Sequence, residues 1–136
     1  WIPHIDTTEN YPLSMLSSKS RARTHSIHGN QEKLNRVDPD NVWVHPEDAA
    51  SRGIQDGQSV RVKSAYGATI LPVRVTKDIA RGCISIKEGR WYMPDADGVD
   101  REGCANSVTG DFSAACGATT YNTAFVDVHP VNPGPM

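Results

Sequence analysis

Cysteine is scarce in this sequence of 136 residues, which holds only Cys83, Cys104 and Cys116. The three stand far apart and form no Cys-x-x-Cys pair, and their odd number does not suggest a closed disulfide framework. The five histidines also lack zinc-like spacing, because the nearest pair, His25 and His28, is not followed by a second ligand pair. We therefore expect the cysteines to be small core or loop residues. A thiol nucleophile paired with a distant histidine stays open, without a pattern that supports it.

Long apolar runs and an excess of positive charge are absent as well. No stretch approaches the about 18 apolar residues that a transmembrane helix needs. The 14 Lys and Arg residues face 16 Asp and Glu residues, whereas a general nucleic-acid binder is normally basic, so we expect no nucleic-acid partner. The sequence begins at Trp1 without an initiator methionine or the features of a signal peptide. We therefore expect it to be one domain excised from a longer protein.

The charges that are present are unevenly distributed. Between Lys19 and Arg36 there are five basic residues against the single acid Glu32, and residues 37–57 reverse the sign, with five acids against one arginine. One interpretation is an ordinary solvated surface. The other is a local anion site near residues 19–26, where cations, hydroxyls and backbone amides are close together in the sequence.

Alternating apolar and polar residues predict a mainly β domain. Short strands are expected at residues 11–16, 42–44, 59–64, 68–76, 83–86 and 124–128. Residues 46–53 predict a helix of about two turns, because Pro46 suits the first helical position and Gly53 the left-handed conformation that ends a helix. Closely spaced strands with turn signals favour a compact barrel over a sandwich. Its core is expected to contain Val60, Val62, Val73, Val75, Ile84 and Ile86.

One long stretch, residues 87–123, is rich in Gly, Asp, Asn and Thr and shows no periodicity. A loop of this length is uncommon in a compact domain unless it is functional, so it is a second place to look for a site. The expected organisation is a linker or disordered segment at 1–10, a barrel domain at 11–129 and a disordered tail at 130–136.

An ordered series of short segments resembles a known family. The matching segments are residues 11–13 (Tyr-Pro-Leu), 23–26 (Arg-Thr-His-Ser), 42–57, 60–67, 89–92 (Gly-Arg-Trp-Tyr) and 98–109. Together they resemble the C-terminal dinucleotide-binding domain of the molybdopterin oxidoreductases, in the branch that contains the catalytic chain of dimethyl sulfoxide reductase. The two segments at 89–92 and 98–109 are those that are similar to the sulfoxide-reductase branch.

The resemblance implies a double-psi β-barrel of the aspartate-decarboxylase-like class, with one or two short helices. It also implies a role as the cofactor-binding domain of a molybdenum oxidoreductase, which holds part of bis(molybdopterin guanine dinucleotide) for two-electron reduction of a sulfoxide or N-oxide. The redox chemistry would belong to the cofactor, so no residue is expected to be catalytic or to bind a metal. The isolated domain is expected to be inactive, and the resemblance leaves open whether it retains the cofactor alone.

The cofactor-binding residues that the resemblance implies fall into three groups. The basic loop supplies phosphate or pterin-side contacts, because hydrogen bonds between cations and phosphate oxygens are strong. Two aromatic residues provide a flat wall for the pterin, and later residues read its donor and acceptor edge, for which asparagine is suited. The residues are Lys19, Arg23, His25 and Ser26; Trp91 and Tyr92; and Asn106, Thr109, Tyr121 and Asn122.

Simpler structural roles are open for several of these residues. His25 and Ser26 could cap their loop, Trp91 could belong to the core, and Asn106 could be a turn residue. A stand-alone double-psi barrel that binds protein or nucleotide, without a redox role, is the alternative function. A self-processing decarboxylase of the same barrel class is disfavoured, because it needs a Gly-Ser cleavage pair and this sequence has none.

The resemblance also implies partners and a location. The remaining domains of the parent catalytic chain are expected to contact this one, and the full complex is expected to add an iron–sulfur electron-transfer subunit and a membrane anchor subunit. The parent is expected to be bacterial, and periplasmic or membrane-associated through those subunits, although this sequence itself carries no signal for its compartment.

Overall fold

The computed structural model describes residues 9–110, 116–118 and 122–131. Most of the expected linker and tail, and Tyr121 among the expected site residues, therefore lie outside the described residues. Within the described ranges the chain forms the elements β1 (Leu13–Ser18), α1 (Glu32–Val37), β2 (Val42–Val44), α2 (Pro46–Ser51), β3 (Ser59–Lys63), β4 (Ala68–Val75), β5 (Cys83–Lys87), the 3-10 turn η1 (Ala105–Ser107) and β6 (Ala124–Pro130).

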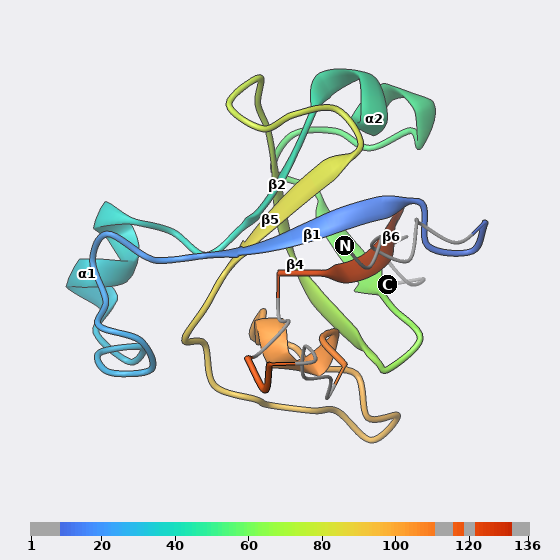
Figure 1. Cartoon of the computed structure of the whole chain (residues 1–136). Coiled ribbons are helices and arrows are strands. Elements are labelled where there is room, and N and C mark those ends of the chain that lie inside the picture. The colour runs from blue at the N-terminus through green and yellow to red at the C-terminus, as the bar shows by residue number, and fades with distance from the viewer. Residues whose placement is uncertain (1–8, 111–115, 119–121, 132–136) are drawn as a thin grey trace.

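The strands close into a barrel in the order β1-β5-β2-β4-β3-β6, with β6 pairing back onto β1 (Figure 1). The pairs β1/β5 and β2/β4 are parallel, and the pairs β1/β6, β2/β5, β3/β4 and β3/β6 are antiparallel. Each of these six strands therefore has a neighbouring strand on both sides. The mainly β, double-psi barrel expected from the sequence is confirmed.

Alternation along the strands fills the barrel with aliphatic side chains. On β3 the pattern runs exposed–buried–exposed–buried–exposed, so that Val60 and Val62 point inward. On β5 Ile84 and Ile86 are buried as well, and Met15 from β1 joins them. Of the six expected core residues only Val75 is partly exposed, at the end of β4, where it still packs against the core.

The helix after β2 forms for the local reasons that its sequence gives. Pro46 occupies the first turn, His45 caps it by accepting a hydrogen bond from Glu47 N at 3.3 Å, and Gly53 follows the C-terminus with φ of 65°. No helix among the described residues is long and apolar enough to cross a membrane.

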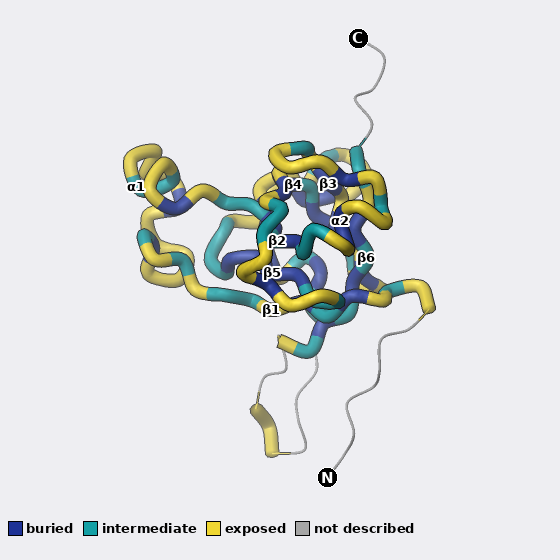
Figure 2. Tube along the Cα trace, turned by 90° about the horizontal axis from the view of Figure 1, so that it is seen from above, coloured by how far each residue is buried: buried dark blue, intermediate teal, exposed yellow. Residues whose placement is uncertain are grey.

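Two long connections stand outside the barrel. The arm, residues 19–41, joins β1 to β2, carries α1, and projects to one side of the molecule (Figures 1 and 2). Helix α1 contributes no buried residue, so the arm is held by other contacts. The lower loop, residues 88–110, leaves β5 and runs below the barrel in Figure 1.

The lower loop is organised around a single buried carboxylate. Asp100 is fully buried and accepts hydrogen bonds from Thr69 Oγ1 of β4 at 2.6 Å, Cys104 N at 2.7 Å and Met93 N at 2.9 Å. Because a buried carboxylate needs such partners, Asp100 fastens both halves of the loop to the barrel. Cys104 is buried beside it, and burial raises the pKa of its thiol, so this cysteine is a core residue rather than a reactive thiolate.

Candidate functional site

The two ends of the arm are joined by a buried ion pair. The Arg23 side chain is 0% exposed, and its two terminal nitrogens donate to the Asp40 carboxylate at 2.7 and 2.6 Å. This two-pronged arrangement is the strongest geometry for an arginine and a carboxylate. The resemblance implies that Arg23 contacts the cofactor, but the structure places its side chain inside the arm. A direct contact with a phosphate would require the pair with Asp40 to open.

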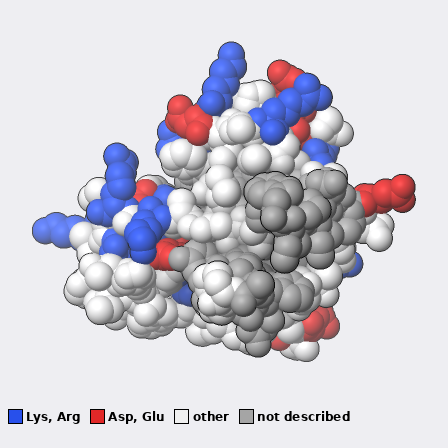
Figure 3. All heavy atoms as spheres, in the orientation of Figure 1, with Lys and Arg blue, Asp and Glu red and all other residues white. Residues whose placement is uncertain are grey.

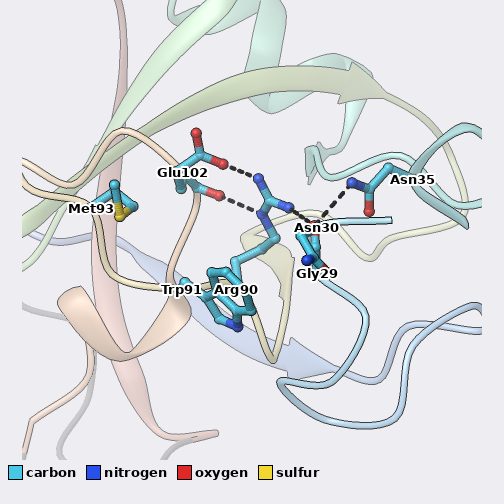
Figure 4. A pocket seen from close by; sticks show the side chains of 7 residues that line it. All are labelled: Gly29, Asn30, Asn35, Arg90, Trp91, Met93 and Glu102. Atoms are coloured by element: carbon cyan, nitrogen blue, oxygen red, sulfur yellow. Dashed lines mark hydrogen bonds and ion pairs between the residues drawn. The ribbon is translucent and has the colours of Figure 1, made fainter. Parts of the chain in front are cut away.

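A second arginine connects the arm to the lower loop. Arg90 donates from Nη1 to the Gly29 carbonyl at 2.7 Å and from Nε to the Glu102 carbonyl at 3.1 Å, and it pairs with the Glu102 carboxylate. Its Nε also lies 3.3 Å from Asp40 Oδ2. Figure 4 shows the guanidinium between Glu102 and Gly29, with the Asn35 amide reaching the same Gly29 carbonyl at 3.0 Å.

Close backbone packing brings the arm tip against the segment that follows β5. Trp91 Nε1 donates to the Ser26 carbonyl at 2.9 Å. Gly89 has φ of 93°, and a Cβ atom there would stand 1.9 Å from the His25 carbonyl oxygen, so only glycine fits. On the other side of this contact, His25 and His28 adopt left-handed backbone with φ of 50° and 71°. Such conformations persist only where the surroundings impose them.

Two exposed basic side chains of the arm share one acid. Lys19 Nζ and His25 Nδ1 lie 2.9 and 3.0 Å from Glu88 Oε1, and the two side chains are 71% and 69% exposed. The hydrogen bond from Lys19 lowers the pKa of Glu88, and His25 adds to the effect, so Glu88 is ionised at neutral pH. Figure 3 shows Lys and Arg side chains gathered over the arm. The patch is therefore basic, but Glu88 neutralises part of it.

A shallow cavity of about 280 Å³ opens where the arm meets the lower loop. Among the expected site residues only Trp91 lines it. The lining residues are Gly29, Asn30, Asn35, Arg90, Trp91, Met93 and Glu102. Trp91 is 50% exposed and Tyr92 54%, so neither is a core residue, and about half of each side chain is open to a ligand.

The remaining expected residues that the structure describes lie at the end of the lower loop and just before β6. Asn106 is exposed in η1, and Thr109 Oγ1 lies 3.4 Å from the Asn106 carbonyl oxygen, so these two share one turn, as the simpler interpretation of Asn106 also expected. Asn122, next to β6 in sequence, accepts from Ser17 N through Oδ1 at 2.7 Å. It therefore stands at the end of β1, just where the arm begins.

The structure thus brings the expected residues together in groups. Lys19 and His25 meet at Glu88, Ser26 meets Trp91, and Asn106 meets Thr109. Sequence reasoning gave no role to the groups that hold these contacts in place, chiefly Asp40, Arg90 and Glu102. For Asp40 the available signal was its place in the acidic run that follows the basic run, because side chains of opposite charge in neighbouring runs can pair. The two runs contain neither Arg90 nor Glu102.

The exposed groups fit a ligand that is both anionic and planar. Lys19 and the Ser26 hydroxyl suit phosphate oxygens, and the exposed faces of Trp91 and Tyr92 suit a heteroaromatic ring. Asn106 and Asn122 offer amides that donate and accept hydrogen bonds. Among the described residues, no group of three or more His, Cys, Asp or Glu side chains could hold a metal ion.

Comparison with known proteins agrees with this chemistry. The chain is 39% identical over 101 residues to dimethyl sulfoxide reductase DmsA of Haemophilus influenzae. The aligned region covers 74% of this chain and 12% of the relative. It is 35% identical over 133 residues to a trimethylamine-N-oxide reductase of the same organism. That aligned region covers 90% of this chain and 16% of the relative. The chain thus spans less than a fifth of the length of these relatives.

A solved structure shows the same fold. Acetylene hydratase from Pelobacter acetylenicus superimposes on this chain with a TM-score of 0.69 at 18% sequence identity. The superimposed part covers 89% of this chain and 18% of the hydratase chain. Residues 13–125 match the family described as molydopterin dinucleotide binding domain. This match begins at the first residue of β1 and ends at the second residue of β6, so it takes in the first five strands of the barrel, the arm and the lower loop. The chain therefore belongs to the molydopterin dinucleotide binding domain family.

Proposed function

We propose that this domain holds part of bis(molybdopterin guanine dinucleotide) in a longer molybdenum oxidoreductase that reduces a sulfoxide or an N-oxide. Membership of the dinucleotide-binding family supports the cofactor, and the names of the relatives support the substrate class. The single structural observation that carries the proposal is the junction of the arm and the lower loop, where exposed cations and exposed aromatic faces are held side by side.

Each group of exposed residues has a proposed task. Lys19, His25 and Ser26 bind phosphate oxygens, with Lys19 and His25 released from Glu88 as the phosphate approaches. Trp91 and Tyr92 form a wall for a flat ring. Asn106, Thr109, Tyr121 and Asn122 hydrogen-bond to the polar edge of the pterin. When bound, the cofactor supplies the molybdenum centre for two-electron chemistry. The residues of this chain bind and orient it and exclude water.

Further domains and subunits are expected because this chain spans less than a fifth of the length of its relatives. We propose that the rest of the parent catalytic chain covers the other side of the cofactor, and that the complex includes an iron–sulfur electron-transfer subunit and a membrane anchor subunit. We place the parent in a bacterium, in the periplasm or at the membrane through those subunits.

The phosphate role is tested by the double variant Lys19→Ala, His25→Ala in the full-length parent. Losing charge-assisted phosphate contacts costs about 1.5–3 kcal/mol, which corresponds to an affinity lower by about 10- to 150-fold. We therefore expect less molybdenum and less acid-released guanine nucleotide per chain after purification and dilution.

The control is the double variant Lys77→Ala, His129→Ala, which removes one exposed lysine and one exposed histidine far from the arm in sequence. It is expected to retain wild-type molybdenum and nucleotide. Full occupancy in the arm variant, with an unchanged unfolding midpoint, would show that the arm does not bind the phosphates.

A further inference from the structure

Arg90 is engaged entirely within the protein, although it lies at the mouth of the cavity. Each of its three guanidinium nitrogens has an acceptor: Nη1 has the Gly29 carbonyl, Nη2 has the Glu102 carboxylate, and Nε has the Glu102 carbonyl. The side chain is only 17% exposed. Arg90 therefore uses its fork of donors within the protein, and the second N–H groups of Nη1 and Nη2 belong to a side chain that is mostly buried. This geometry suits a residue that holds protein segments together better than one that presents its charge to a phosphate.

The acceptors of Arg90 come from three segments that are far apart in the sequence. Gly29 belongs to the tip of the arm, Asp40 to its return, and Glu102 to the lower loop. Asp40 in turn holds the buried Arg23, so the charges alternate through the junction as plus, minus, plus, minus. Because a planar guanidinium has donors in several fixed directions, a single residue can bind all three segments at once.

The residues with proposed phosphate and ring contacts depend on this junction. His25 and Ser26 lie between Arg23 and Gly29, on the part of the arm with left-handed backbone at His25 and His28. Trp91 follows Arg90 directly and holds the Ser26 carbonyl. Without a fixed junction, the strained backbone would relax, and the exposed groups would lose their shared arrangement before any ligand arrives.

We propose that Arg90 is a positioning residue, which fixes the arm against the lower loop and so prepares Lys19, His25, Ser26 and Trp91 for the cofactor without touching it. This inference rests on the proposed function. It adds a specific residue whose effect on cofactor retention is indirect and passes through the conformation of residues 24–30.

The test uses Arg90→Lys in the full-length parent. Lysine keeps the positive charge but cannot reproduce the fork of donors. In the cofactor-free protein we expect amide hydrogen exchange of residues 24–30 to accelerate about tenfold, while exchange in β3 to β5 stays at its wild-type rate. In the loaded protein, guanine nucleotide should dissociate about 10- to 100-fold faster, as when groups that orient direct ligands are removed.

The matched control is Arg52→Lys. Arg52 has a similarly buried side chain, 19% exposed, and also bridges a carboxylate and a carbonyl, namely Asp127 at 3.1 Å and Asp48 O at 3.3 Å. It lies at the end of α2, away from the arm, so neither exchange at 24–30 nor nucleotide release should change. If Arg90→Lys unfolds the domain, Glu102→Gln removes the negative charge that pairs with Arg90, from a side chain that is 43% exposed. This variant should give the same changes at smaller size.

The outcomes separate this inference from the proposed function. Wild-type exchange at residues 24–30 in Arg90→Lys would overturn it, whatever the cofactor does. Faster exchange with wild-type nucleotide release would also overturn it, and would leave the proposed function intact if Lys19→Ala, His25→Ala releases nucleotide faster. If neither variant releases nucleotide faster, the inference and the proposed function fail together.

Discussion

Replacing Lys87 by methionine is expected to lower the free energy of unfolding of the chain by about 3 kcal/mol, the lower end of the range for breaking a buried ion pair. Lys87 lies at the end of β5, where Nζ donates to Asp38 Oδ1 at 2.5 Å and to the Pro39 carbonyl at 2.6 Å. Both charged side chains are less than a tenth exposed. Methionine fills a similar volume but leaves the Asp38 carboxylate without its cation.

The expected loss in the free energy of unfolding is at the lower end of the range because two other hydrogen-bond donors to Asp38 remain. Ser20 Oγ and Arg21 N both bind Asp38 Oδ2, at 2.8 and 2.9 Å. Urea denaturation measures the difference, with Lys77→Met, at an exposed lysine, as a control expected within about 0.5 kcal/mol of wild type. Adding Asp38→Asn to Lys87→Met should recover part of the loss, because the unpaired charge is gone. An unchanged midpoint for Lys87→Met would contradict the pairing.

The same pair predicts how stability depends on pH. Burial opposes ionisation of Asp38, but the hydrogen bonds from Lys87, Ser20 and Arg21 outweigh it and lower the pKa from 3.8 to about 2. The unfolded chain therefore binds more protons than the folded chain between these values. The corresponding stability, about 2 kcal/mol, is fully present above about pH 4 and is lost as the pH falls to about 2. Asp38→Asn should reduce this acid dependence.

Replacing Ile84 by alanine is expected to destabilise the chain by about 2–5 kcal/mol, the range for removing a large aliphatic side chain from a packed core. Ile84, the second residue of β5, is 0% exposed and lies between Met15 of β1 and Val44 of β2 in the sheet register. The loss includes the transfer of the side chain and the cavity left in a closed barrel, which has little freedom to collapse.

The control variant changes a side chain on the outer face of the barrel. Arg61 is exposed on β3 between two buried valines, so Arg61→Ala should change the free energy of unfolding by less than about 0.5 kcal/mol. Chemical denaturation of both variants tests the assignment of strand faces. A negligible loss for Ile84→Ala together with a large loss for Arg61→Ala would mean that the inner and outer faces had been exchanged.

The barrel could be predicted because its signals are local. In β3 burial follows a two-residue period, and in α2 the proline, acids and glycine mark both ends of the helix. In β5 the sequence alternates between apolar and polar residues, although Ser85 and Lys87 are buried as well as Ile84 and Ile86. The arm carries no such signal. Helix α1 has no side-chain cap and buries none of its residues, so neither periodicity nor capping distinguishes it from a polar loop.

The placement of Arg23 shows why the site was harder to predict than the fold. An arginine in a basic loop has the same local sequence whether it faces a phosphate or a carboxylate. Its partner, Asp40, lies 17 residues away, and the junction is completed by Arg90 from beyond β5. The ordered structure of the lower loop could not be predicted for a similar reason. Asp100 organises this loop through Thr69 of β4, which is distant in the sequence, and nothing near Asp100 in the sequence indicates burial.

The central claim, that the junction of arm and lower loop faces the cofactor, is tested most directly by amide hydrogen exchange of the full-length parent with and without bound cofactor. The account predicts slower exchange in the loaded protein at residues 19–26, 89–92 and 106–109, with little change on the outer face of β3. Equal exchange of the arm and the lower loop in the two states, with protection confined to other domains, would contradict it.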